Sequence, residues 1–223
     1  MNAVSLIALS AAFLLGVEHS FEPDHVVAVS TIVTQSHGVV KSLLSGSLWG
    51  LGHTMALLVA GMIVISLRIQ MPPSISGAFD FAVGLMLITL GVWAVINVKR
   101  RKFHFHVHSH DGKLHAHIHS HADGPAHDHP HIPFSVGMVH GLAGTGALVV
   151  FAMSTMANIT DGMLFIAAFG AGLIIAMSVI GSVLNVPISH GGKFAEKTAF
   201  VLQAGAGLLS MALGAFVVTG FLF

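Results

Sequence analysis

Long apolar stretches alternate with short polar segments along the whole chain. Six stretches are long enough to supply the roughly 20 residues that an α-helix needs to cross a bilayer. The pattern therefore predicts an all-α integral membrane protein with six transmembrane helices. We expect these helices at residues 4–33, 43–66, 76–98, 134–157, 161–184 and 199–222.

The first stretch is too long to be one straight membrane span. A continuous helix of about thirty residues would measure roughly 45 Å, whereas the hydrocarbon core is about 30 Å thick. Pro23 offers a break, because proline lacks an N–H and fits the first turn of a new helix. We expect two half-helices on either side of an irregular segment from Glu18 to Glu22.

The two halves of the chain resemble each other. Gly16–His19 is echoed by Gly137–His140, and Gly50–Gly52 by Gly170–Gly172; a third glycine pattern matches spans three and six, all at offsets of 120 to 123 positions. Each half has three spans, so the second half must be inverted relative to the first. Inverted repeats with broken helices are a transporter architecture. The predicted units are a first three-helix repeat at 1–98, a loop at 99–133 and a second repeat at 134–223.

Composition agrees with a membrane protein. Hydrophobic residues make up 54% of the 223 residues and charged residues only 8%, against about 25% charged in soluble domains. The formal net charge is zero, so nothing indicates a nucleic-acid partner. The absence of cysteine excludes thiolate metal sites, disulfides and redox-active thiols. The N-terminus lacks the basic region of a cleavable signal, so we expect Met1 onward to be mature sequence.

Basic residues predict the orientation. If the N-terminus is outside, eight of the nine Lys and Arg residues face the cytoplasm and only Arg68 faces out, which agrees with the positive-inside rule. We therefore expect a multi-pass protein of the cell membrane with both termini outside. The loop between spans three and four would then be cytoplasmic.

That loop is rich in histidine. Its remaining residues cannot build a core, so we expect it to be disordered and to bind divalent transition metals loosely. A solvated spacer is the alternative reading, although a spacer does not need so many histidines. They are His104, His106, His108, His110, His115, His117, His119, His121, His127, His129 and His131.

A second group of metal-binding side chains lies inside the first span. An ionisable side chain at membrane depth costs roughly 2.5–3.5 kcal/mol on insertion scales, so such a group indicates function. Breaking the helix before Pro23 lets His19 approach Asp24 and His25, and the N-terminus of the second half-helix stabilises Asp24. Imidazole with carboxylate suits divalent nickel, cobalt, zinc or iron. Glu18 and Glu22 would orient the ligands or carry protons.

Other polar residues in the spans are candidates too. His53 follows a glycine pair in the second span, and His140 occupies the position equivalent to His19 in the second half. We include both as metal ligands, although a lone histidine in a membrane span is more often a hydrogen-bonded packing residue. Asp80 could attract cations, but we expect it to mark a solvated helix start instead. His37 and His190 are expected to be incidental.

These motifs resemble the nickel/cobalt transporter family. The resemblance rests on His19-x4-Asp24-His25, on Leu51-Gly52-His53, on the histidine-rich loop and on His140–Gly144. It extends over essentially the whole chain and is closest to the short six-span branch, which includes transporters encoded beside urease genes. The larger uptake transporters have eight spans, so this chain lacks a pair. The resemblance implies Ni²⁺ or Co²⁺ as the transported substrate, with His19, Asp24, His25 and His53 in metal recognition.

The leading hypothesis is a secondary transporter. The resemblance implies uptake, because the efflux branch of the family, which also has histidine-rich loops, tends to lack the carboxylate that Asp24 provides before His25. The expected partners are a divalent transition-metal ion and the lipid bilayer, and no prosthetic group is expected. The chain has no phosphate-binding Gly-x4-Gly-Lys-Ser/Thr loop, so it is not expected to be an enzyme that hydrolyses ATP. A separate ATPase or a cytoplasmic metallochaperone stays open as a partner. The alternatives are nickel, cobalt or zinc efflux, a membrane metalloenzyme, and a metal store or sensor.

Overall fold

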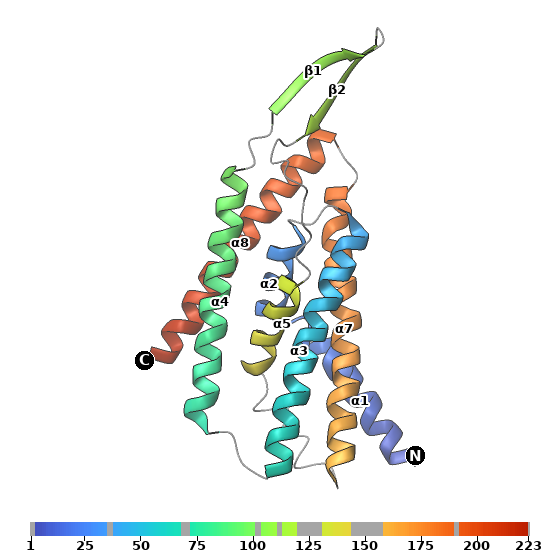
Figure 1. Ribbon diagram of the computed structural model, residues 1–223, viewed down its shortest axis with the longest axis vertical. Coiled ribbons are helices and arrows are strands. Elements are labelled where there is room, and N and C mark those ends of the chain that lie inside the picture. Colours follow the sequence, from blue (N-terminus) through green and yellow to red (C-terminus); the bar gives the residue numbers. More distant parts are fainter. Residues whose placement is uncertain are drawn as a thin grey trace.

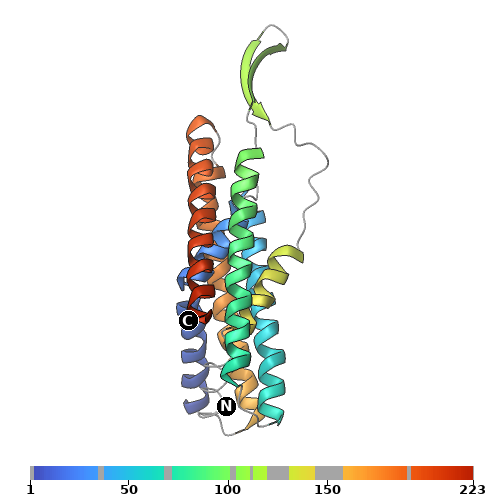
Figure 2. The same cartoon turned by 90° about the vertical axis from the view of Figure 1, so that its left-hand side faces the viewer.

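A computed structural model describes residues 3–34, 38–67, 72–100, 104–110, 113–119, 131–143, 158–189 and 192–222. The helices in these ranges form an elongated bundle, and a two-stranded hairpin projects from one end of it (Figures 1 and 2). The elements are α1 (Ala3–His19), α2 (Pro23–Val33), α3 (Val39–Leu67), α4 (Pro73–Arg100), β1 (His104–His110), β2 (Lys113–His119), α5 (His131–Ala143), α7 (Ile159–Ser189) and α8 (Gly192–Leu222).

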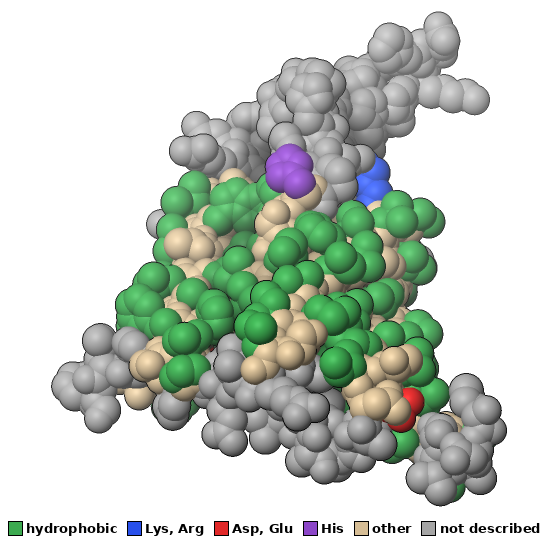
Figure 3. All heavy atoms as spheres, turned by 60° about the horizontal axis from the view of Figure 1, so that its bottom comes forward, with side chains coloured by type: hydrophobic (Ala, Val, Ile, Leu, Met, Phe, Trp, Pro, Cys, Tyr) green, Lys and Arg blue, Asp and Glu red, His purple; other side chains and the backbone are tan. Residues whose placement is uncertain are grey.

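The described helices agree with a membrane protein. Four of them are long and apolar enough to cross a membrane, over Val39–Val64, Ser74–Asn97, Ile159–Pro187 and Thr198–Gly220. Many large hydrophobic side chains are exposed, and Figure 3 shows them covering the visible face of the bundle with few charged groups between them. In water such a surface would drive aggregation, whereas in lipid it matches its surroundings.

The predicted break in the first span is confirmed. In its place are two short apolar helices, α1 ending at His19 and α2 beginning at Pro23. Glu22 has the extended backbone, ψ 141°, that steric contact with a following proline imposes. Of the fourth predicted span, 134–157, the structure describes only the part that lies in α5, because residues 144–157 lie outside the described residues.

The loop prediction needs correcting between residues 104 and 119. We expected no regular structure, but β1 and β2 pair antiparallel, with His104 opposite His119, His106 opposite His117 and His108 opposite His115. Histidine alternates with other, mostly apolar, residues along both strands, which is the period of a β-strand. Composition alone therefore hid a strand pattern. His121, His127 and His129 lie outside the described residues.

Glycines allow the long helices to touch through their backbones. A Cβ on Gly16 of α1 would collide with the carbonyl of Phe169 and meet the Leu173 nitrogen at 3.1 Å, both in α7. The same geometry recurs between α5 and α3. There, a Cβ on Gly137 would collide with the carbonyl of Trp49 and meet the His53 nitrogen at 3.1 Å. The α1–α7 contact and the α5–α3 contact are thus built alike.

The α4–α8 contact is reciprocal as well. A Cβ on Gly84 would lie 3.0 Å from the carbonyl oxygen of Gly214, and one on Gly214 would lie 2.5 Å from that of Gly84. Gly91 and Gly207 face each other in the same way one contact further along. Ser210 adds a hydrogen bond by donating from Oγ to the carbonyl oxygen of Leu87, 2.7 Å away. Small residues and buried hydroxyls are the usual means of holding helices together in lipid.

We predict that Gly91→Ala destabilises the protein. Its new Cβ would lie 2.5 Å from the Gly207 carbonyl oxygen, and because these are backbone atoms, α4 and α8 must separate. The expected loss is about 1–3 kcal/mol, typical of overpacking. Thermal unfolding in detergent would measure it as a lower melting temperature. Gly205→Ala on α8 is the matched control, because its Cβ meets nothing within 4 Å. Equal melting temperatures for the two variants would contradict the prediction.

Candidate metal centre

The break between α1 and α2 places two histidines side by side. The chain turns through hydrogen bonds from the Phe21 nitrogen to the Glu18 carbonyl, 3.0 Å, and from the Glu22 nitrogen to the His19 carbonyl, 3.1 Å. His19 therefore closes one helix while His25 lies in the first turn of the next. Their ring centroids are 4.3 Å apart, although on an unbroken helix the side chains would point about 120° apart.

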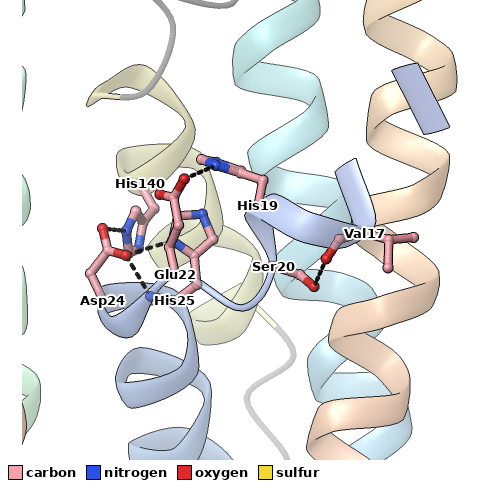
Figure 4. Close-up of polar contacts among 7 residues, drawn as sticks. All are labelled: Val17, His19, Ser20, Glu22, Asp24, His25 and His140. Carbon is pink, nitrogen blue, oxygen red and sulfur yellow. Dashed lines mark hydrogen bonds and ion pairs between the residues drawn. The ribbon is translucent and has the colours of Figure 1, made fainter. Parts of the chain in front are cut away.

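Asp24 joins two histidines from distant parts of the sequence. Its Oδ1 accepts hydrogen bonds from the backbone nitrogen and Nδ1 of His25, both at 2.9 Å, and its Oδ2 accepts one from Nε2 of His140 at 2.9 Å (Figure 4). His140 lies on α5, so this carboxylate ties α2 to the second half of the chain. An ionised carboxylate only accepts hydrogen bonds, so both ring nitrogens must carry protons.

Because one nitrogen of each ring carries a proton towards Asp24, the other nitrogen of that ring has a free lone pair. Nε2 of His25 and Nδ1 of His140 are buried and have no hydrogen-bond partner within the described part of the chain. The same is true of both ring nitrogens of His53, whose side chain is completely buried. A buried nitrogen without a partner is costly, so it needs a ligand to compensate.

His19, His25 and His53 form a group that fits a metal ion. Each offers a ring nitrogen, and these nitrogens all lie within 4.8 Å of one another. Glu22 Oε1 lies 2.7 Å from Nδ1 of His19, which leaves the other nitrogen of that ring available. Metal-ligating histidines usually donate their second N–H to a carboxylate, and both His19 and His25 have such a partner.

Aromatic rings close the centre on its α3 and α7 sides. Trp49 of α3 is fully buried, and its ring centroid lies 5.1 Å from that of His25, 5.4 Å from His53 and 5.2 Å from His140. Phe169 of α7 lies 5.3 Å from His19. Excluding water on these sides strengthens the interaction of an ion with the ligands that remain.

A cavity of about 490 Å³ adjoins the centre on the opposite side. His19, Glu22, Asp24, His25 and His140 line it from the centre. Ala143 of α5 and residues of α4 and α8 form the rest of its wall, among them Asp80 and Gly220. The centre is therefore dry on one side and reachable on the other.

The structure brings together all five predicted ligands, His19, Asp24, His25, His53 and His140. Asp24 contacts two histidines directly, so orienting them is the role that its hydrogen bonds favour. A second group of ligand atoms, from Asp24, His25 and His140, also lies within 4.8 Å.

The two glutamates are placed differently. Glu22 contacts His19 as expected of an orienting residue, whereas Glu18 is exposed and contacts none of these side chains within the described residues. Sequence reasoning missed Trp49, although its position four residues before His53 places both on one helix face.

The chemistry of this donor set is that of a borderline transition metal. Imidazole nitrogens with a carboxylate, and no sulfur, suit divalent nickel, cobalt, copper or zinc. Calcium and magnesium prefer oxygen ligands, so they fit poorly.

Comparisons with known proteins agree with a membrane protein. Residues 65–216 match the family described as the cytochrome C biogenesis protein transmembrane region. The chain is also similar to the urease accessory protein UreH of Bacillus sp. (strain TB-90), at 37% identity over 194 residues, which covers 85% of this chain and 81% of that protein. No solved structure matches.

We predict that Asp24→Asn weakens metal binding about 10- to 100-fold, the usual effect of losing a carboxylate that orients a ligating histidine. An amide has only one accepting oxygen, so it cannot hold both His25 and His140. Quenching of Trp49 fluorescence by Ni²⁺ or Co²⁺ would report binding. Trp93, the other tryptophan, is exposed, and both proteins should carry Trp93→Phe so that only Trp49 emits. Unchanged affinity would show that Asp24 does not organise the centre.

Proposed function

Because the chain belongs to the cytochrome C biogenesis transmembrane family and to the family of the urease accessory protein UreH, we propose that it transports Ni²⁺ or Co²⁺ across the cell membrane. The observation that carries the proposal is the set of buried, unpartnered histidine nitrogens inside a bundle of apolar helices. The resemblance of the His19–His25 motif to nickel/cobalt transporters supports these ions as the substrate.

The centre recognises the ion by replacing its water. His19, His25 and His53 supply nitrogen ligands, Asp24 and Glu22 hold the rings in position, and the negative carboxylates offset the charge of the cation. The ligands must be neutral imidazoles, so protons compete with the metal. An ion held by three nitrogens can still be released, because the remaining positions stay open to water or to a later ligand.

The reciprocal glycine contacts support two inverted three-helix repeats as the moving parts. In this proposal the α1–α7 contact corresponds to the α5–α3 contact. Within the α4–α8 contact, the approach of Gly84 to Gly214 corresponds to that of Gly214 to Gly84. The centre lies between the halves, because His140, which is hydrogen-bonded to Asp24, comes from the second half and the other residues of the centre come from the first. Rocking one half against the other would expose the ion to one side and then to the other.

Uptake is the proposed direction, with both termini outside and the hairpin in the cytoplasm. The ends of α1 and α8 that carry the termini lie in the half of the molecule away from the hairpin, which suits this orientation (Figures 1 and 2). The histidines of β1 and β2 would receive the ion on the cytoplasmic side.

We predict that His25→Ala abolishes ⁶³Ni²⁺ flux into proteoliposomes of known orientation. The substitution removes a ligand and releases Asp24 from one of its two histidines. His37→Ala, a histidine of a predicted loop outside the described residues, is the control for losing an imidazole elsewhere. Normal flux in His25→Ala would refute the centre. Wild-type protein that binds nickel without flux would favour a metalloenzyme or a store, and flux only outward would favour efflux.

We predict that deleting residues 104–131 leaves a transporter with partial activity. The hairpin lies beyond the end of α4, and the ligand groups found among the described residues include none of its histidines, so the maximal rate should largely survive. The apparent KM for external nickel should also stay close to the wild-type value, because the hairpin histidines receive the ion only after it has left the centre. Complete loss of flux, in protein that still elutes as a folded species, would place an essential ligand in the loop.

A further inference from the structure

The cavity beside the centre extends towards one end of the bundle. Its wall on the far side from the centre is formed by Gly77 and Asp80 near the start of α4 and by Val217 and Gly220 near the end of α8. Figures 1 and 2 show the start of α4 at the end of the molecule opposite the hairpin. The cavity therefore leads from the buried histidines towards the end of the bundle where α4 begins.

Asp80 is unusual for its position. It is the only charged residue between 74 and 97, a stretch apolar enough to span the membrane. Its side chain is exposed and makes no hydrogen bond or ion pair within the described part of the chain. A carboxylate facing lipid would be strongly unfavourable, but a carboxylate facing a water-filled cavity is not. Its place in the cavity wall explains how the membrane tolerates it.

The cavity is large enough for a hydrated ion. A divalent cation with six waters needs about 200 Å³ at about 30 Å³ per water, and the cavity holds about 490 Å³. The space beside Gly220 is open, because a Cβ there would meet no described atom within 4 Å. Glu22 lines the same cavity with a side chain that is 52% exposed, so a second carboxylate lies beside His19.

We propose that this cavity is the aqueous route by which a hydrated divalent cation reaches the centre from the end opposite the hairpin, and that Asp80 draws the cation into it. The proposal rests on the proposed transport function and extends it to a residue outside the centre. The cation meets Asp80 first while fully hydrated, then Glu22, and sheds its water only at the histidines. Carboxylates that line a narrow, low-dielectric passage concentrate cations and raise association rates.

The first test replaces the charge of Asp80. Asp80→Asn should raise the apparent KM for ⁶³Ni²⁺ uptake at low ionic strength by about three- to tenfold, with little change in maximal rate, because attraction and not the centre is lost. Asp80→Glu should restore the wild-type KM. Asp161→Asn is the matched control: it removes one carboxylate from the first turn of α7, where Asp161 pairs with Asn158 and does not line the cavity. A KM equal to the wild-type value in Asp80→Asn, or an equal rise in Asp161→Asn, would overturn the role of Asp80.

The second test uses the absence of cysteine from the sequence, so that an introduced thiol is the only one. A positively charged, water-soluble methanethiosulfonate reagent reacts with a thiolate in contact with water, so Gly220→Cys should react roughly tenfold faster than a lipid-facing thiol. Gly205→Cys is the matched control, since Gly205 lies on the same helix in equally open space but outside the cavity wall. Modified Gly220→Cys should lose transport relative to the same protein before modification. Equal labelling rates, or full transport after modification, would overturn the route.

Stopped-flow quenching of Trp49 by Ni²⁺ separates the two proposals. If the access route is wrong, Asp80→Asn associates with Ni²⁺ as fast as wild type while flux remains normal. If the transport function is wrong, wild-type protein shows no flux, although Ni²⁺ still binds and Asp80→Asn still slows its association.

Discussion

The Asp24 carboxylate is the interaction on which the rest of the site depends. It accepts hydrogen bonds from His25 and His140, so it determines which nitrogen of each ring is left with a lone pair. It also holds α2 against α5, although the two are far apart in the sequence. The side chain of Asp24 is only partly buried, at 30% exposed, and it lines the cavity. Both of its oxygens are nevertheless paired with histidines, and this pairing is what allows it to organise the rings.

Close helix packing supplies the other condition. His53 belongs to α3, and it reaches the histidines of α1 and α2 only because the helices approach to backbone contact at their glycines. Lipid offers no hydrophobic force between helices, so contacts of this kind hold the bundle together. The same packing removes water from the Trp49 side, while small residues of α4 and α8 leave room on the opposite side.

Much of this arrangement could be predicted from the sequence. Pro23 within an overlong apolar stretch predicted the break, and the break predicted that His19 and His25 converge. The hydrogen bond between Asp24 and His140 could not be predicted, because it depends on how α5 lies against α2, which no local pattern encodes. The hairpin was missed for a different reason: polar composition was given more weight than the alternation of residues. For Asp80 the sequence favoured a solvated helix start, because only the packing of α4 against α8 and the centre places this residue in a cavity wall.

The reciprocal helix contacts pair residues of unlike chemistry. In the α1–α7 contact, Gly16 packs against the backbone of Phe169 and Leu173. In the α5–α3 contact, Gly137 packs in the same way against Trp49 and His53. The contact requires glycine on one helix but involves only backbone atoms of the other, so the side chains of the facing residues are free to differ. One half can therefore change its reactive groups while the other keeps its shape. Like backbone contacts therefore carry unlike side chains: apolar ones where α1 meets α7, and an indole and an imidazole where α5 meets α3.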